Sequence, residues 1–274
     1  MLVFPGCKIN LGLNIIERRS DGFHDIETVF YPMKWKDALE VIPSKTGLHM
    51  DITVSGLPIE LGKKDENILY KAWQLLGKRY KIPPVDVFLH KNLPMGAGLG
   101  GGSSNAAAFL KLLNQKFDLK VPKTELLEIA RQLGADCAFF MKNEPVFATE
   151  KGDVFEKIEL DLSNYYILVV YPGINSNTKE AYEGVIPNKP LRSVKDIILN
   201  DPIENWKNVL NNDFENSIFK KYPEVEMLKR KLYDSGAIYA SMSGSGSACF
   251  GIFKERPKPN FPQNYLFFLQ EAKF

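Results

Sequence analysis

The chain has 274 residues, of which 45% are hydrophobic and 25% are charged, and its formal net charge is +2. This composition is typical of a folded globular protein and argues against a disordered chain, while so small a net charge does not favour a nucleic-acid partner. Apolar runs such as YYILVVYPG are far shorter than the roughly 20 residues of a membrane span, and no signal-like segment opens the chain. We therefore expect a cytoplasmic protein without a membrane anchor.

The first elements predicted in chain order lie before residue 92. Residues 48–54 alternate apolar and polar side chains, which predicts a strand with one buried face. The side chains expected to point inward are Leu48, Met50, Ile52 and Val54. Residues 65–80 carry apolar side chains at helical spacing after Asp65, a predicted N-cap, and residues 85–91 again alternate as in a strand.

A glycine-rich segment follows that strand. Residues 94–109 read PMGAGLGGGSSNAAAF, with five glycines within 96–102. Two serines and an asparagine then offer alternative N-caps to an alanine- and leucine-rich run, which favours a helix. The predicted order is strand, glycine loop, helix.

This order of elements points to phosphate binding. A helix amino terminus has up to four unpaired backbone N–H groups, and glycines just before it remove the side chains that would keep a phosphate away. The alternative is a flexible turn with no ligand. A Walker loop is excluded because no lysine follows the glycines, and a dinucleotide-binding Rossmann unit is disfavoured because a second helix, rather than a strand, follows.

Further elements follow beyond residue 120. Residues 123–134 predict an amphipathic helix that ends at Gly134 in a left-handed conformation. The later predicted elements are a hairpin over 145–160 turning at 151–153, a buried strand over 165–173, and helices near 192–199, 203–210 and 223–234. A second segment, SMSGSGSACFGIF over 241–253, combines Gly244 and Gly246 with serines before a short apolar strand at its end.

These elements predict an α+β fold, because strands form early and late blocks without regular alternation with helices. A composition shift near residue 160 suggests two lobes. We expect residues 1–160 to form an amino-terminal lobe and residues 161–274 a carboxyl-terminal lobe.

Three segments resemble the motifs of the GHMP kinase superfamily, in matching order along nearly the whole chain. They are PGCKINLGLNIIERRSDGFHDIETVF, PMGAGLGGGSSNAA and SMSGSGSACF. The resemblance implies a two-lobed fold with the active site in a cleft between the lobes, and ATP-dependent phosphoryl transfer to a small molecule. It implies that residues 1–160 form the ATP-binding lobe and residues 161–274 the substrate-binding lobe. The first segment is similar to that of one member, which phosphorylates the 2-hydroxyl of a cytidine-diphosphate-linked methylerythritol in the non-mevalonate route to isoprenoid precursors.

The resemblance also implies roles for the glycine loop and for magnesium. The residues expected to bind ATP are Pro94, Met95, Gly96, Ala97, Gly98, Leu99, Gly100, Gly101, Gly102, Ser103 and Ser104. Mg²⁺ is expected to bridge the β- and γ-phosphates. Either serine is a candidate contact, and no metal-binding residue is assigned from the sequence.

Asp136 and Lys8 are the candidate catalytic pair. Asp136 stands among apolar neighbours in GADCAFF, where an isolated carboxylate would be costly and would need a partner. Lys8, in a similarly apolar setting, is the candidate, and both match the family's catalytic lysine and aspartate. The match implies that Lys8 stabilises the charge of the transferring phosphoryl group and that Asp136 acts as the general base. The alternative is a buried salt bridge without a chemical role.

Substrate contacts are likewise implied by the resemblance. The residues expected to bind substrate are Asn10, Phe23, His24, Tyr182, Ser243 and Gly244. His24 can read a cytosine edge through its ring nitrogens, and Phe23 or Tyr182 can stack on the base. Two departures stand out: Phe23 replaces the family's frequent tyrosine and removes a hydroxyl, and Ala138 replaces a frequent proline and leaves the backbone less restrained.

Other functions remain open at this level. Cys7, Cys137 and Cys249 and the three histidines are scattered without metal-ligand spacing, so neither a disulfide framework nor a structural zinc site is expected. The close rival is another GHMP kinase acting on homoserine, a sugar or a mevalonate derivative. A binding module without catalysis and a nicotinamide oxidoreductase are further alternatives. We expect a small-molecule cytidylyl substrate, no nucleic acid or membrane partner, and a monomer or homodimer.

Overall fold

The computed structural model describes the chain except residues 46, 48, 59–62 and 273–274. Its helices and strands form an α+β architecture, as predicted. Contacts between residues divide the chain into two compact units, each built from several stretches of sequence. The first unit comprises Met1–Cys7, Met33–Met95 and Gly100–Glu144; the second comprises Lys8–Pro32, Gly96–Leu99 and Pro145–Phe274. These units differ from the expected lobes 1–160 and 161–274, because β2, β3 and part of the glycine loop group with the elements after residue 145.

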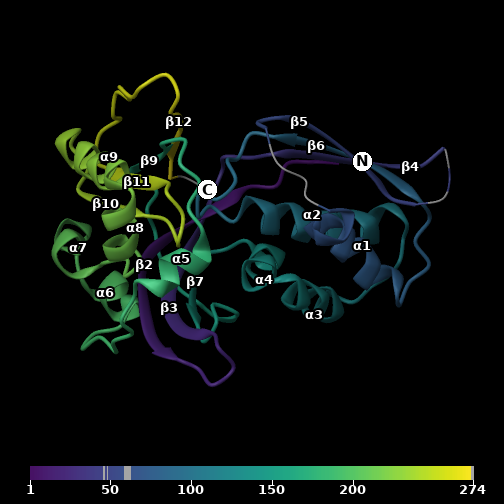
Figure 1. Ribbon diagram of the computed structural model, residues 1–274, viewed down its shortest axis with the longest axis horizontal. Coiled ribbons are helices and arrows are strands. Elements are labelled where there is room, and N and C mark those ends of the chain that lie inside the picture. The colour runs from purple at the N-terminus through teal and green to yellow at the C-terminus, as the bar shows by residue number, and fades with distance from the viewer. Residues whose placement is uncertain (46, 48, 59–62, 273–274) are drawn as a thin grey trace. The chain divides into compact units, whose positions relative to one another are not determined.

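The first unit has a four-stranded sheet against which helices pack. In the order β1-β4-β6-β5, the strands are β1 (Leu2–Val3), β4 (Ala38–Pro43), β6 (Val85–Lys91) and β5 (Asp51–Gly56). Its helices are α1 (Ile68–Gly77), α2 (Gly101–Lys116), α3 (Lys123–Leu133) and α4 (Ala135–Lys142), with a 3-10 turn at Lys64–Glu66. Helices α1 and α2 lie along one face of this sheet (Figure 1), and apolar side chains of α1, α2 and α3 form one core with those of β4, β5 and β6.

The predicted strands of this unit are largely confirmed. Strand β6 has the predicted bounds, and β5 occupies the later part of the expected strand. Met50 is fully buried, while Ile52 and Val54 are half-buried between exposed neighbours, which confirms the alternation. Leu48 lies outside the described residues.

Two helix starts differ from the prediction. Asn67, rather than Asp65, is the N-cap of α1: its side chain accepts a hydrogen bond from the Leu69 N–H, while Asp65 lies in the preceding 3-10 turn. Helix α2 begins directly within the glycines, with Gly100 as its N-cap, so Ser103 and the other predicted caps lie inside the helix. The left-handed φ of Gly100 (69°) starts the helix without a side-chain cap.

Helix α3 ends at Leu133, as predicted, but the conformation of its last cap differs. Gly134 has φ 156° and ψ 158°, outside the left-handed helical region, because the same glycine also serves as the N-cap of α4. One residue thus separates two consecutive helices.

The second unit contains two four-stranded sheets. One has the order β2-β3-β7-β8, with β2 (Cys7–Arg18), β3 (His24–Met33), β7 (Val146–Thr149) and β8 (Val154–Lys157). The other has the order β10-β11-β9-β12, with β10 (Tyr239–Met242), β11 (Cys249–Phe253), β9 (Tyr166–Tyr171) and β12 (Leu266–Glu271). The helices are α5 (Thr178–Glu183), α6 (Val194–Asn200), α7 (Ile203–Val209), α8 (Glu215–Lys221) and α9 (Pro223–Asp234). Figure 1 shows α8 and α9 beside β10 and β11.

Most predicted elements of this unit are confirmed. The hairpin forms as the antiparallel pair β7 and β8, the buried strand is β9, and the three predicted helices are α6, α7 and α9. The sequence analysis assigned no strands to the amino-terminal motif, which folds as β2 and β3, and it missed α5, α8, β10 and β12.

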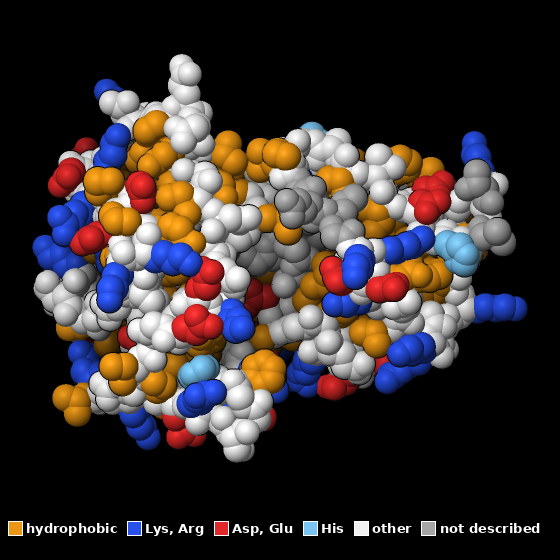
Figure 2. Space-filling view, viewed as in Figure 1, with side chains coloured by type: hydrophobic (Ala, Val, Ile, Leu, Met, Phe, Trp, Pro, Cys, Tyr) orange, Lys and Arg blue, Asp and Glu red, His pale blue; other side chains and the backbone are white. Residues whose placement is uncertain are grey.

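The described surface carries charges of both signs. Figure 2 shows Lys and Arg side chains interspersed with Asp and Glu over the visible face, in keeping with a net charge of +2. Within the described residues, no helix is both long and apolar enough to cross a membrane.

Candidate active site

The glycine loop connects β6 to α2 through a backbone that turns repeatedly. Gly96, Gly98 and Gly100 have φ of 65°, 79° and 69°, a region that residues with a side chain rarely adopt. No side chain caps the first turn of α2. Its amino-terminal N–H groups therefore form the kind of site that accepts an anion.

A buried aspartate anchors the backbone that leads into this loop. The Asp37 carboxylate, with no exposed surface, accepts hydrogen bonds from the Asn92 and Leu93 N–H groups, both at 2.8 Å, and from Asn105 Nδ2 at 2.9 Å. It also forms an ion pair with Lys91, whose side chain is 3% exposed. One carboxylate thus ties the end of β6 to the first turns of α2, although no sequence motif marks it.

The loop packs its first half against the third motif. Ser243 Oγ donates to the Gly98 carbonyl at 3.0 Å, and the Ala248 N–H donates to the Ala97 carbonyl at 3.2 Å. A Cβ on Gly98 would lie 1.8 Å from the Ser243 carbonyl oxygen, and a Cβ on Gly246 would lie 1.9 Å from the Ala97 backbone. The glycines of the two motifs allow the two backbones to touch.

Lys8 and Asn10 lie side by side on β2 in the same unit. Lys8 Nζ donates to Asn10 Oδ1 at 2.6 Å and lies 5.0 Å from the centre of the Phe30 ring. Asn10 Nδ2 donates in turn to Thr28 Oγ1 at 3.0 Å. All these polar side chains are buried, so the lysine amine has a fixed direction within the second unit.

Gly244 borders the same lysine. Its φ is 56°, and a Cβ there would lie 3.2 Å from Asn10 Oδ1 and 3.3 Å from Lys8 Nζ. The predicted residues Lys8, Asn10, Ser243 and Gly244 are therefore brought together with the loop residues 96–98. A side chain at position 244 would press on the polar pair.

Asp136 belongs to the first unit, where it lies in the first turn of α4. It is half-buried, less than its apolar neighbours in the sequence suggested, because Cys137 and Ala138 take the fully buried positions. A Cβ on Gly100 would lie 3.2 Å from Asp136 Oδ2. The carboxylate therefore faces the backbone at the start of α2, beside the N–H groups described above.

The two serines after the glycines have different surroundings. Ser104 is 3% exposed and donates its N–H to the Gly100 carbonyl at 2.9 Å, whereas Ser103 is half-buried. Burial raises the pKa of the Cys137 thiol, in the first turn of α4, to about 11. The Cys137 thiol is consequently neutral near pH 7, and all three cysteines are free and buried.

Three predicted substrate residues line one pocket of the second unit, of about 790 Å³. The His24 and Tyr182 rings stack with centroids 4.6 Å apart, and Phe23, 60% exposed, lies under Lys151 Nζ at 5.3 Å. Burial, and secondarily the charge of Arg18, lowers the pKa of His24, so its ring is neutral at pH 7. Asn10 does not line this pocket.

The sequence analysis missed three cationic residues of this pocket. Arg18 lies at the end of β2, Lys151 in the turn of the β7–β8 hairpin, and Lys179 in α5. The available signals were the position of Arg18 within the amino-terminal motif and the hairpin turn at Lys151, since turn residues often carry function. Among the described residues, no group of three or more His, Cys, Asp or Glu side chains is arranged to hold a metal ion.

Comparison with family models identifies both parts of the chain. Residues 67–144 match the GHMP kinases N terminal domain, and residues 194–266 match the GHMP kinases C terminal domain. The first match contains the glycine loop and Asp136, and the second contains the third motif.

Comparison with whole proteins narrows the family. The chain is 48% identical over 259 residues to 4-diphosphocytidyl-2-C-methyl-D-erythritol kinases of Bacteroides fragilis and of Cytophaga hutchinsonii, covering 94% of this chain and 94% of each relative. A crystal structure of 4-(cytidine 5'-diphospho)-2C-methyl-D-erythritol kinase aligns with a TM-score of 0.74 at 30% identity, covering 92% of this chain and 90% of that one.

A more distant structure shares the fold alone. Homoserine kinase from Cytophaga hutchinsonii aligns with a TM-score of 0.66 at 16% identity, over 97% of this chain and 95% of that one. Sequence identity to the two 4-diphosphocytidyl-2-C-methyl-D-erythritol kinases (48%) is three times the identity to this homoserine kinase (16%), over a similar share of the chain. The chain belongs to the GHMP kinases and, within them, to the 4-diphosphocytidyl-2-C-methyl-D-erythritol kinase family.

Proposed function

We propose that the protein transfers the γ-phosphoryl group of ATP to the 2-hydroxyl of 4-diphosphocytidyl-2-C-methyl-D-erythritol, a step of the non-mevalonate route to isoprenoid precursors. The observation that carries this proposal is the 48% identity, over 94% of the chain, to kinases named for that substrate.

ATP binds at the glycine loop in this proposal. The uncapped start of α2 supplies backbone N–H groups and the positive end of the helix dipole, which stabilise an anion by roughly 0.3–2 kcal/mol. A Cβ on Gly102 would meet nothing within 4 Å, which leaves space for the phosphates at this position. The proposed ATP contacts remain residues 94–104.

Lys8 and Asp136 carry the chemistry in this proposal. Asp136 accepts the proton of the attacking hydroxyl, and the Lys8 ammonium offsets the negative charge of the transferring group. Phosphoryl transfer depends chiefly on such alignment and charge stabilisation. The buried chain from Lys8 through Asn10 to Thr28 supports this role, because it restricts where the ammonium can point.

Magnesium is the expected second cofactor. Mg²⁺ commonly binds through one or two protein oxygens together with phosphates and water, so the lack of a three-residue cluster among the described residues fits this ion. Ser103 is the more accessible of the two serine candidates, and Asp136 is the nearby carboxylate of the same unit. When bound, the ion would neutralise charge on the β- and γ-phosphates.

The pocket around His24 takes the cytidine end of the substrate. Neutral His24 can both donate to and accept from the cytosine edge, while Phe23 and Tyr182 offer aromatic faces for the base. Loss of the tyrosine hydroxyl at Phe23 leaves its stacking face unchanged. Arg18 and Lys151 add positive charge for a diphosphate.

The decisive experiment measures ADP formation with Mg²⁺, ATP and 4-diphosphocytidyl-2-C-methyl-D-erythritol, beside homoserine, galactose and mevalonate. Turnover confined to the cytidylyl substrate is expected. Turnover with only one of the other acceptors would keep the ATP loop and overturn the proposed acceptor. Removal of Mg²⁺ with EDTA should stop the reaction, and added Mg²⁺ should restore it.

Asp136→Asn tests the general base. We expect kcat to fall by roughly 10²- to 10⁴-fold, while the Kd for ATP stays near that of the parent. Asp118→Asn is a matched control, because Asp118 is a strongly exposed aspartate of the same unit. Retention of more than about a tenth of the parent kcat would exclude Asp136 as the base.

We further propose that the enzyme works in the cytoplasm as a monomer or homodimer without a nucleic-acid partner. Cell fractionation and light scattering test the first two points. Retention on a nucleic-acid column at physiological salt would contradict the third.

A further inference from the structure

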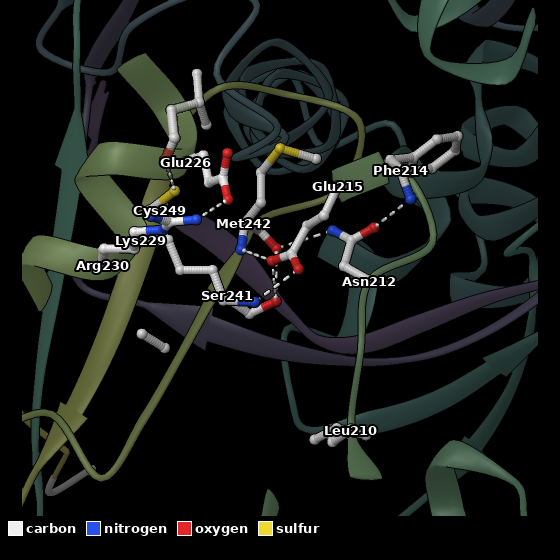
Figure 3. A network of polar contacts seen from close by, with 12 residues as sticks. Leu210, Asn212, Phe214, Glu215, Glu226, Lys229, Arg230, Ser241, Met242 and Cys249 are labelled. Carbon is white, nitrogen blue, oxygen red and sulfur yellow. Dashed lines mark hydrogen bonds and ion pairs between the residues drawn. The ribbon is translucent and has the colours of Figure 1, made fainter. Parts of the chain in front are cut away.

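The segment between α7 and α8 forms hydrogen bonds with the backbone of the third motif. Asn212 is 2% exposed, and its Nδ2 donates to the carbonyl oxygens of Met242 and Gly244, both at 2.9 Å. Its Oδ1 accepts from the Phe214 N–H at 3.0 Å (Figure 3). Both polar atoms of the side chain are hydrogen-bonded, and a side-chain amide in this orientation supplies both the two donors and the acceptor.

Glu215 also binds the end of β10. One carboxylate oxygen accepts from the Met242 N–H at 2.9 Å and from Ser241 Oγ at 3.1 Å, and the other accepts from Lys229 Nζ at 2.6 Å. Figure 3 shows Asn212 and Glu215 converging on Met242. The N–H and the carbonyl of one residue are thus both fixed by this segment.

The segment is also bonded to the strand that carries Lys8. The Leu13 N–H donates to the Asn211 carbonyl at 2.8 Å, and the Asp213 N–H donates to the Leu13 carbonyl at 2.9 Å. The Ile15 N–H donates to Asp213 Oδ2 at 2.7 Å. Asn212 therefore lies between β2 and the third motif, with hydrogen bonds on both sides.

The consequence concerns Gly244. Its carbonyl accepts from Asn212, and its α-carbon is so close to Lys8 and Asn10 that an added Cβ would lie 3.3 Å from Lys8 Nζ. A shift of the Gly244 backbone would therefore change the position and orientation that the Lys8 ammonium can adopt. Catalytic groups lose much of their effect when displaced by a fraction of an ångström.

We propose that Asn212 is a positioning residue, whose doubly donating amide holds the Gly244 backbone against the Lys8 ammonium and keeps that ammonium directed for phosphoryl transfer. This inference rests on the proposed function, because it uses the role assigned to Lys8. Glu215 supports it by fixing Met242.

The test is Asn212→Ala, compared with Ile218→Val, a conservative change of a buried apolar side chain in α8. We expect kcat of Asn212→Ala to fall at least 10-fold, with KM for ATP and for the acceptor within 3-fold of the parent. Ile218→Val should keep the parent kcat. A folded Asn212→Ala enzyme with kcat within 3-fold of the parent would overturn the proposal.

A conservative variant guards against loss of folding. Asn212→Ser keeps one hydroxyl donor and is expected to have a kcat between those of Asn212→Ala and the parent. If both variants fail to fold, Asn212 is needed for stability alone and the positioning role is withdrawn.

A substrate-free readout separates this inference from the proposed function. The rate of Lys8 acylation by acetic anhydride, followed by mass spectrometry with exposed Lys36 as reference, should rise at least 3-fold in Asn212→Ala. An unchanged rate contradicts the positioning role whatever the acceptor. Absence of parent turnover with the cytidylyl substrate contradicts the proposed function and leaves the labelling result valid.

Discussion

Glycines near the two ends of the glycine loop differ in what an added Cβ would meet. Residues Gly96–Leu99 group with the second unit, and the loop from Gly100 onward groups with the first. In the first half an added Cβ would lie 1.8 Å from its nearest neighbour at both Gly96 and Gly98. At Gly102 it would meet nothing within 4 Å.

The difference separates glycines that packing requires from one that it does not. Gly96 and Gly98 are required by the packing of this chain against itself, whether or not a ligand binds. Gly102 has no such requirement, and a glycine in a helix costs roughly 0.5–1 kcal/mol relative to alanine. The proposed function supplies a reason for Gly102, because a phosphate bound at the start of α2 would have to reach its backbone.

The largest effect is expected at Gly98. Gly98→Ala places a Cβ against the Ser243 carbonyl, which is backbone and cannot move aside, at a φ of 79°. We expect a loss of about 2–5 kcal/mol in the free energy of unfolding, combining the cost of the left-handed conformation with overpacking. Urea unfolding measures it, with Gly77→Ala as a control, because Gly77 lies in α1 and a Cβ added there would meet no atom within 4 Å. Equal stability of the two variants would contradict the first half of the comparison.

A smaller loss is expected at Gly96, because its nearest neighbour is a side chain. A Cβ there would meet Asn175 Oδ1, which can rotate away. Gly96→Ala should cost about 1–3 kcal/mol, and combining it with Asn175→Ala should leave only the backbone term of about 1–2 kcal/mol. Additive losses in the double-mutant cycle would show that the contact with Asn175 does not matter.

Gly102→Ala should separate stability from binding. The free energy of unfolding should stay unchanged or rise by up to about 1 kcal/mol. The KM for ATP should increase roughly 2- to 30-fold, which corresponds to losing the 0.3–2 kcal/mol of anion stabilisation at a helix start. If ATP kinetics are unaffected, the phosphates do not approach this glycine.

The smallest effect concerns pH, because neither half of the loop has a side chain that titrates between pH 5 and 8. His24 is the expected source: its pKa is lowered from the ordinary 6.5, first by burial and then by Arg18. As the pH falls below 6.5, His24 binds a proton in the unfolded chain before it does so in the folded chain. The free energy of unfolding should therefore decrease as the pH falls from 6.5 through the folded-state pKa of His24.

NMR titration and paired unfolding curves test this sign. His24 should titrate below 6.5, and Arg18→Gln should raise its pKa. Relative to His24→Gln, the parent should lose stability between pH 7 and pH 5.5. A His24 pKa above 6.5 would reverse the expected sign.

Much of the fold could be predicted because it depends on local patterns. Alternation fixed β6 and hairpin turn residues marked β7 and β8. The long strands β2 and β3 were missed, because both have long runs of consecutive buried residues and such strands show little alternation. The start of α2 was misplaced because the serines and Asn105 favour caps locally, whereas Asn105 instead donates to Asp37.

The sequence by itself determined the family and the position of the glycine loop, since both depend on the order of residues along the chain. Only the tertiary structure decided that Gly98 packs on Ser243 and that Asn212 supports Gly244. It also decided that His24 stacks on Tyr182. These pairs are separated by 32 to 158 residues, and such contacts follow from how strands and loops pack, which no local propensity encodes.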